Sequence, residues 1–164
     1  MQIGILSDTH DNHRSVRRAI EIFNERDTEC VLHAGDMTGA GTASLFAQLR
    51  SRRFVVVTGN CDADRVALRQ AVETFGGEVY ESSFDGQVGD KAVYMAHIPH
   101  SVKRAIDSQS YDLVVYGHTH QQDTHRVGKT LIVNPGSARN GLAAGGHIAI
   151  VDLADMSVTF ESLV

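Results

Sequence analysis

The feature that most constrains this sequence is a short apolar run ending at a side chain that can bind metal, a pattern that occurs five times. The clearest run, residues 112–116, leads into Gly117-His118-Thr119-His120. The other four runs lead to Asp8 and His10, to Asp36, to Asn60 and to His97. All five are rich in residues that favour β-strands. Because ligands at the ends of neighbouring strands meet at one edge of a sheet, the sequence predicts a single shared site.

In the first half of the chain, predicted strands alternate with predicted helices. The strands cover residues 2–7, 29–34 and 54–58. The first helix, which Asp11 or Asn12 can cap, extends to about residue 26 because its apolar positions recur with helical spacing. A second helix is predicted over residues 42–50, and a third presents Leu68 and Phe75. Three successive strand-helix units predict a parallel sheet with right-handed crossovers.

Strands dominate the second half of the chain. They are predicted at residues 79–81, 84–88, 91–96, 113–116, 123–127, 130–133, 147–151 and 158–160, with turn residues between them. One helix interrupts them, with Ser101 as its candidate cap. We therefore expect a second, largely antiparallel sheet, and two sheets with helices outside them form a four-layer α/β/β/α sandwich. No linker divides residues 1–164, so one α/β (α+β) domain is expected.

Composition narrows the functional classes. Hydrophobic residues make up 42% of the chain and charged residues 21%, as in ordinary globular proteins. No apolar run approaches the roughly 18 residues that span a bilayer, and no secretion signal precedes the first strand, so we expect no membrane partner and a cytoplasmic location. Cys30 and Cys61 are expected to be reduced thiols. A net charge of −5 with scattered basic residues argues against nucleic acid as a partner, except as a nucleotide-like substrate.

The residues at the strand ends form a mixed oxygen and nitrogen donor set. It comprises two carboxylates, one amide and four imidazoles: Asp8, Asp36, Asn60, His10, His97, His118 and His120. Unless Cys61 joins, it contains no thiolate, which favours Mn²⁺, Fe or Zn²⁺ in a reactive site over a structural zinc site. Seven ligands are too many for one ion. They suit two ions about 3.5–4 Å apart, with one carboxylate bridging them.

The motifs also resemble a known family in their order along nearly the whole chain. They are Asp8-Thr9-His10-Asp11-Asn12, His33-Ala34-Gly35-Asp36, Gly59-Asn60-Cys61-Asp62, His97, Gly117-His118-Thr119-His120 and Asn134-Pro135-Gly136-Ser137. This series resembles the calcineurin-like metallophosphoesterases, and in particular their small YfcE-like phosphodiesterases. The resemblance implies the metallo-dependent phosphatase fold, with two mixed β-sheets flanked by helices. It also implies two divalent metal ions, with Mn²⁺ favoured over Fe, Zn²⁺ and Ni²⁺.

The same resemblance implies how the ligands divide between the two ions. Asp8, His10 and His120 would bind the first ion, and Asn60, His97 and His118 the second. Asp36 would bridge the pair. Two divalent ions, two carboxylates and a bridging hydroxide leave a net charge of +1, which favours an anionic substrate even in an acidic protein.

We therefore expect a metal-dependent phosphoesterase that acts on a small phosphoester, with a preference for diesters. The hydroxide that bridges the two ions would attack phosphorus in line. A phosphomonoesterase or nucleotide pyrophosphatase with the same ions is one alternative. A non-catalytic binding scaffold, like the retromer scaffold subunit, is another, although no ligand position has been replaced here. The exposed strand edges of the second half also suggest a homo-oligomer.

Two departures from the family pattern concern the chemistry. Larger members carry a histidine after the metal-binding asparagine, where this chain has Cys61, so the catalytic set is expected to be Asp36, Asn60, Cys61 and His100. His33 and His13 are further candidates for the proton donor, although His33 suits a packing role better. The second departure is His97-Ile98-Pro99-His100, where the family has glycine after the ligand histidine.

One more motif allows two interpretations. The segment Asn134-Pro135-Gly136-Ser137 is first predicted to be a tight turn. The family-based alternative is a loop that faces phosphate, in which case Arg139 would bind an oxyanion.

Overall fold

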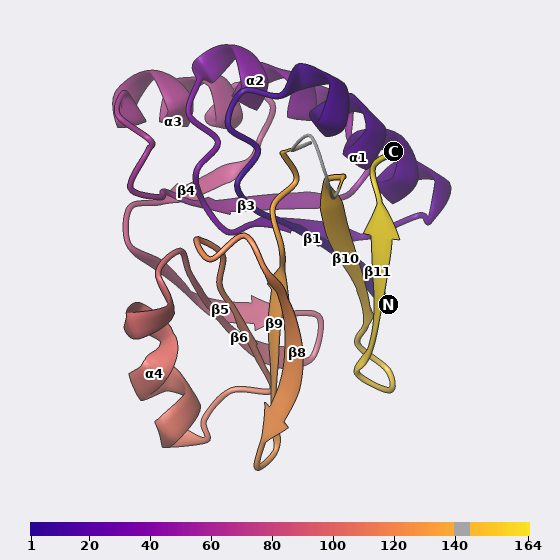
Figure 1. Ribbon diagram of the computed structural model, residues 1–164, viewed down its shortest axis with the longest axis vertical. Coiled ribbons are helices and arrows are strands. Elements are labelled where there is room, and N and C mark those ends of the chain that lie inside the picture. Colours follow the sequence, from indigo (N-terminus) through magenta and orange to yellow (C-terminus); the bar gives the residue numbers. More distant parts are fainter. Residues whose placement is uncertain (140–144) are drawn as a thin grey trace.

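The computed structural model describes residues 1–139 and 145–164, which form four layers (Figure 1). The first sheet has the order β11 (Ser157–Ser162), β10 (His147–Asp152), β1 (Gln2–Leu6), β2 (Cys30–His33), β3 (Arg53–Val57) and β4 (Glu78–Tyr80). The second has the order β5 (Ser83–Val88), β6 (Lys91–Ala96), β7 (Leu113–Val115), β9 (Thr130–Pro135) and β8 (Gln122–Val127). These layers confirm the predicted α/β/β/α sandwich.

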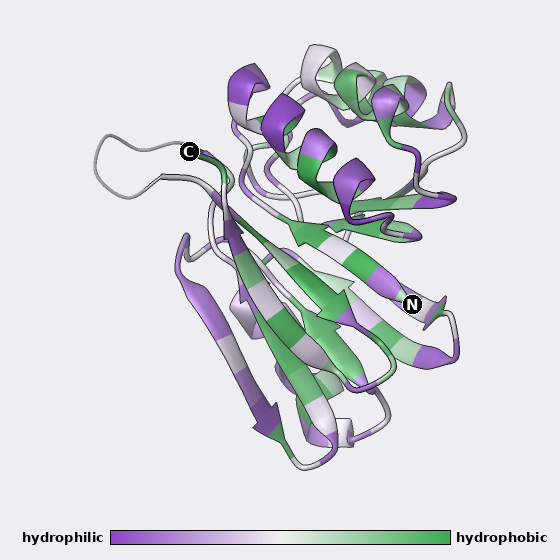
Figure 2. Cartoon of the chain, turned by 90° about the vertical axis from the view of Figure 1, so that its right-hand side faces the viewer, coloured by the Kyte–Doolittle hydropathy of each residue, from purple (hydrophilic) through white to green (hydrophobic). Residues whose placement is uncertain are grey.

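Helices cover the outer face of each sheet (Figure 1). The first sheet is covered by α1 (His13–Glu25), α2 (Ala40–Leu45) and α3 (Arg65–Glu73), and the second by α4 (Pro99–Ser108). Figure 2 shows hydrophobic residues concentrated in the strands, whereas the helices alternate between hydrophobic and hydrophilic stretches. The core between the sheets packs β1, β2 and β3 against β6, β7 and β9, which fixes the position of one sheet on the other.

The two mixed sheets that the resemblance implied are confirmed, whereas the largely antiparallel second sheet expected from the strand pattern was wrong in composition and in strand direction. From the second half of the chain, β4 joins the first sheet parallel to β3, and β10 joins it antiparallel to β1. The second sheet is mixed, because β6 pairs parallel with β7 and β7 parallel with β9. The β6–β7 connection contains α4, and a crossover through a helix returns the chain parallel to its starting strand. Both sheets are therefore mixed.

Two helix boundaries also differ from the prediction. The predicted helix over residues 42–50 is divided into α2 and the 3₁₀ turn Phe46–Gln48. Helix α4 starts at Pro99 instead of after Ser101, with Ile98 as the residue before its first turn. Proline suits the first helical position because its fixed φ matches the helix and its missing N–H has no partner there. His100 consequently lies within the first turn of α4.

No helix among residues 1–139 and 145–164 has the length and apolar character to cross a membrane.

Candidate metal centre

Five loops bring the predicted ligands to one edge of the sandwich. Asp8 and His10 follow β1, Asp36 follows β2, Asn60 follows β3, His97 follows β6, and His118 and His120 follow β7. Backbone bonds join the loops, because the Asp8 amide donates to Gly35 O at 2.9 Å and the Gly117 amide donates to His97 O at 3.0 Å. The edge therefore contains side chains from both sheets.

Several of these ligands have an uncommon backbone conformation. The φ angle is positive at 55° for Asp8, 42° for His10, 58° for Asp36, 68° for His118 and 59° for His120. Residues with a side chain rarely adopt this region, and where they do the surrounding structure must hold them there. The left-handed turns point these side chains towards a common centre, and sequence patterns did not reveal them.

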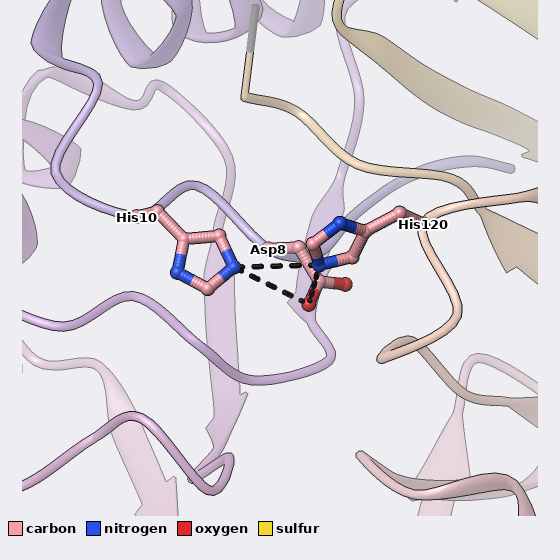
Figure 3. Close-up of side chains that lie close together, drawn as sticks. All are labelled: Asp8, His10 and His120. Atoms are coloured by element: carbon pink, nitrogen blue, oxygen red, sulfur yellow. Dashed lines mark hydrogen bonds and ion pairs between the residues drawn. The ribbon is translucent and has the colours of Figure 1, made fainter. Parts of the chain in front are cut away.

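The first group of donors is Asp8, His10 and His120, whose side chains point toward one another in Figure 3. Nε2 of His120 lies 3.1 Å from Asp8 Oδ1 and 3.4 Å from His10 Nε2. The third distance, from His10 Nε2 to Asp8 Oδ1, is 3.8 Å. Three donor atoms at this spacing surround a point where one ion could be coordinated.

The second group is Asn60, His97 and His118. Asn60 Oδ1 lies 3.1 Å from His97 Nε2 and 3.1 Å from His118 Nδ1. An amide oxygen and two imidazole nitrogens thus share one small region next to the first group. His97 is buried, whereas Asn60 and His118 are exposed, so the second group opens to solvent on one side.

Asp36 lies between the two groups. Its Oδ2 is 3.8 Å from His10 Nε2 in the first group and 3.4 Å from His97 Nε2 in the second. Its Oδ1 accepts a hydrogen bond of 2.8 Å from the Cys61 amide, which leaves Oδ2 to face both groups. Burial by itself would raise the pKa of Asp36, but hydrogen bonds from His97 and the Cys61 amide outweigh it and hold the pKa well below its ordinary value. Asp36 is therefore a carboxylate at neutral pH.

Neighbouring groups orient the ligand atoms. The Ser7 hydroxyl donates to Asp8 Oδ2 at 2.6 Å and the His118 amide donates to the same oxygen at 3.0 Å, so Oδ1 is the oxygen that faces the first group. Nδ1 of His97 lies 2.7 Å from the Ala34 carbonyl oxygen, which can only accept. His97 therefore keeps a proton on Nδ1, and its Nε2 is directed at Asp36 Oδ2 and Asn60 Oδ1, where it could bind a metal ion in place of its own proton.

Two glycines let the loops approach one another closely. A Cβ on Gly59 would collide with Asp36 Oδ1, and one on Gly117 would collide with Ser7 Oγ and lie 2.9 Å from Asp8 Oδ2. Glycine is required at both positions because the backbone passes directly beside a ligand carboxylate or the group that holds it.

Asp62 is a functional residue to which the sequence pattern gave no role. Its buried carboxylate accepts three backbone hydrogen bonds, from Asp36 at 3.1 Å, from Gly59 at 2.6 Å and from Thr38 at 2.7 Å. It therefore joins the loop after β2 to the loop after β3. Its position in Gly59-Asn60-Cys61-Asp62 was the only signal in the sequence.

His33 is fully buried beside the site, and its contacts assign it a positioning role. Its Nδ1 accepts from the Gly35 amide at 3.2 Å, so Nε2 carries the proton and donates to Thr9 Oγ1 at 3.2 Å. Burial lowers its pKa to about 4, so the ring is neutral near pH 7. His33 thus connects the loops after β1 and β2, which favours the packing role over that of a proton donor.

Residues 134–137 do not form the tight turn that the sequence predicted. Asn134 and Pro135 belong to β9, and only Gly136, with a φ of 80°, turns the chain. The buried Asn134 amide donates to Gly117 O and to Thr119 Oγ1, both at 3.0 Å, and so holds the loop that carries His118 and His120. Sequence analysis missed this role.

The residues after Gly136 also contact the site. The Ser137 hydroxyl donates to Asp8 O at 3.0 Å, and the Arg139 amide donates to the same oxygen at 3.1 Å. Arg139 is exposed. This segment thus supports Asp8 through its backbone, while the proposed contact of the Arg139 side chain with an oxyanion stays a prediction.

The candidate proton donors lie in different places. Cys61 Sγ groups with the ligand atoms of His10 and Asp36, all within 4.8 Å of one another. His100 and His13 are exposed in the first turns of α4 and α1, and neither belongs to the clusters of ligand atoms found among the described residues. The positions of these residues therefore favour Cys61 over His100 and His13 as the proton donor.

The two cysteines should differ sharply in reactivity towards Ellman's reagent. Burial raises the pKa of the Cys30 thiol to about 12, and Cys30 is enclosed in the core. A hydrogen bond to Asp36 raises the pKa of Cys61, but this residue is exposed. We expect the native protein to release one equivalent of chromophore, faster as pH rises, and a second only in guanidinium. Cys61→Ser should remove the first equivalent; fast reaction of both thiols in the native protein would contradict the assignment.

Comparison with known proteins decides the family. The model of the calcineurin-like phosphoesterase superfamily domain matches residues 1–156. The chain belongs to the calcineurin-like phosphoesterase superfamily. A phosphodiesterase of Methanocaldococcus jannaschii is 34% identical to it over 155 residues, which are 93% of each protein.

Solved structures agree with this membership of the calcineurin-like phosphoesterase superfamily. The structure of an archaeal phosphodiesterase matches with a TM-score of 0.92 and 30% identity, covering 99% of both chains. The phosphoesterase YfcE from E. coli matches with a TM-score of 0.71 and 17% identity over the full length of both chains, which shows the shared fold. The resemblance on which the sequence interpretation rested is thus confirmed.

The donor chemistry of this calcineurin-like phosphoesterase fits divalent metal ions. Two buried carboxylates approach histidine nitrogens within 4 Å, and the hydrogen bond from His97 Nδ1 to Ala34 O directs Nε2 toward one of them. Carboxylate, amide and imidazole donors suit Mn²⁺, Fe or Zn²⁺. The role of each of the seven residues as a ligand stays a prediction.

Proposed function

We propose that this protein is a phosphodiesterase that uses two divalent metal ions, most suitably Mn²⁺. One observation carries the proposal: Asp36 Oδ2 faces His10 in one donor group and His97 in the other. A carboxylate in that position can bridge two ions, and two bridged ions are the usual device for displacement at phosphorus. The 34% identity to a phosphodiesterase supports the diester preference.

The residues divide between the proposed ions as the resemblance implied. Asp8, His10 and His120 would hold the first ion, Asn60, His97 and His118 the second, and Asp36 would bridge them. When bound, the ions would acidify a water molecule and neutralise charge that develops on the phosphoryl oxygens. Ser7, Asp62 and Asn134 keep the ligands in place through the bonds described above, so that little reorganisation is needed during the reaction.

The exposed side of the donor groups is where a substrate would arrive. Asn60, His118 and His120 are exposed, whereas Asp8 and Asp36 are buried beneath them. Cys61 lies beside Asp36, and its raised pKa keeps the thiol protonated near pH 7. It could therefore give a proton to the leaving alcohol, with the exposed His100 as the alternative donor. Two free thiols are also compatible with the reducing cytoplasm, the compartment that we propose.

The decisive test is metal-dependent hydrolysis of bis-p-nitrophenyl phosphate. Protein stripped with a chelator should be inactive between pH 6 and 9, and Mn²⁺ should restore release of p-nitrophenolate. p-Nitrophenyl phosphate and a nucleotide pyrophosphate serve as competing substrates. Fast turnover of either with little diester hydrolysis would replace the diesterase proposal, and no metal-stimulated hydrolysis of any substrate would favour a binding scaffold.

A further inference from the structure

A small cavity opens directly beside the second donor group. It measures about 240 Å³, and Asn60 and His97 form part of its wall. The other lining residues come from the ends of β3 and β4 and from the starts of α3 and α4: Thr58, Gly59, Arg65, Glu81, Ser82, Ile98 and Ser101. This volume is below the roughly 300 Å³ at which pockets for whole small molecules begin. The cavity is therefore the right size for one part of a substrate.

The charged lining of the cavity is balanced. Arg65 provides a positive charge and Glu81 a negative one. The Arg65 guanidinium donates to two backbone carbonyls, from Nε to Asp62 O at 3.3 Å and from Nη2 to Gly59 O at 3.5 Å. The groups that accept from Arg65 are thus neutral, and within the described part of the chain the ion-pair partner of Glu81 is Arg69, at 3.9 Å. A cavity without net charge disfavours both a second phosphate and a cationic group such as choline.

The remaining polar groups point to hydroxyls in the occupant. Among residues 1–139 and 145–164, the side-chain oxygens of Ser82 and Ser101 and Nη1 of Arg65 have no hydrogen-bond partner. With the Glu81 carboxylate, they offer donors and acceptors around a small volume. Ile98, which is 40% exposed, contributes the one large apolar surface of the lining. These polar side chains and Ile98 are exposed at the mouth of the cavity, and a lining that combines one apolar side chain with donors and acceptors matches a group that carries C–H bonds and hydroxyls together.

The position of the cavity identifies which part of a diester it would hold. Neither Cys61 nor His100, the two candidate proton donors, lines it. The leaving alcohol needs such a donor, so the substituent that stays on phosphorus is the better occupant. We propose that this cavity binds the retained substituent of the diester and selects a small polyol, such as a glyceryl or ribosyl group. The inference rests on the proposed phosphodiesterase function.

The test compares diesters that share p-nitrophenolate as leaving group, with Mn²⁺-loaded protein. The retained substituent is a methyl, glyceryl or p-nitrophenyl group, or a methyl riboside attached through its 5-oxygen. We expect kcat/KM to be at least about tenfold higher for a polyol diester than for the methyl diester. The kcat/KM values of the glyceryl and ribosyl substrates show which of the two polyols the cavity prefers. Equal values for methyl and polyol substrates, or a preference for p-nitrophenyl over both polyols, would overturn the inference.

Two variants locate the preference in the cavity. Ser101→Trp fills it from the first turn of α4, and Glu81→Ala removes an acceptor without adding bulk. In both variants, kcat/KM for the polyol diester should fall close to kcat/KM for the methyl diester, so that their ratio is near 1. Glu81→Ala keeps the test valid if the tryptophan prevents folding. Ser110→Trp, at an exposed serine beyond α4, is the matched control and should keep the ratio.

The result separates the cavity from the proposed function. If both variants keep the wild-type preference, the cavity is not the polyol site. If Mn²⁺ stimulates hydrolysis of every diester equally, the polyol inference fails while the phosphodiesterase function stands. If Mn²⁺ stimulates hydrolysis of no diester, the proposed function itself fails, and the assignment of the cavity fails with it.

Discussion

Replacing Asp36 by asparagine is expected to lower kcat/KM for bis-p-nitrophenyl phosphate by about a thousandfold, or about 4 kcal/mol of transition-state stabilisation. Asparagine keeps the size of the side chain and an oxygen that can accept from the Cys61 amide. It removes the negative charge and replaces one of the two oxygens with a donor NH₂ group. The single oxygen cannot both accept from Cys61 and bridge two ions, so the affinity for both should fall.

Metal content distinguishes this bridging role from an ordinary ligand role. Elemental analysis after Mn²⁺ loading should find both ions depleted in Asp36→Asn. His120→Ala should deplete only the first ion and His118→Ala only the second, because these histidines face different groups. Asp107→Asn, an exposed carboxylate on α4 paired with Lys103, is the control and should retain two ions and full activity. Two retained ions in Asp36→Asn would refute the bridge.

Replacing Asp62 by alanine is expected to cost about 3 kcal/mol or more of unfolding free energy. Three backbone N–H groups lose a charged acceptor at once, and hydrogen bonds to charged groups are worth about 1.5–3 kcal/mol each. In a chain of 164 residues this corresponds to a fall in Tm of roughly 6–12 °C. Thermal and denaturant unfolding measured with bound metal removed would isolate this effect from metal binding.

A neighbouring aspartate provides the matched control for Asp62. Asp64 caps α3 through one hydrogen bond of 3.0 Å to the Ala67 amide and is exposed, so Asp64→Ala should cost only about 1 kcal/mol. Asp62→Asn, which keeps one accepting oxygen, should fall between the two alanine variants. If Asp62→Ala unfolds no more easily than Asp64→Ala, the carboxylate does not hold the two loops together.

The convergence of the ligands could be predicted from sequence because it depends on local patterns. Apolar runs followed by Asp8, Asp36 and Asn60 predicted strands in one parallel sheet, and parallel strands end at the same edge. The structure brings these residues together with the histidines that follow β6 and β7. The series of motifs also resembled the family to which the chain belongs.

What sequence analysis missed depends on contacts between distant segments. The antiparallel place of β10 beside β1 joins residues near opposite ends of the chain, and no local pattern encodes that choice. The tether from Asn134 to Gly117 and the three acceptor bonds of Asp62 are invisible for the same reason. The start of α4 at Pro99 is a local signal, but Ser101 is also a favourable cap residue, and the sequence pattern does not decide between the two positions.

Each donor group takes side chains from both sheets. Asp8, His10, Asp36 and Asn60 come from loops of the first sheet, and His97, His118 and His120 from loops of the second. An ion in either position would therefore act as a cross-link between the sheets at the edge of their shared core. By mass action, such binding would stabilise the folded protein by RT ln(1 + [L]/Kd), where [L] is the free metal concentration and Kd the dissociation constant of the ion. The free metal concentration would therefore set the resistance of the molecule to unfolding as well as its catalytic state.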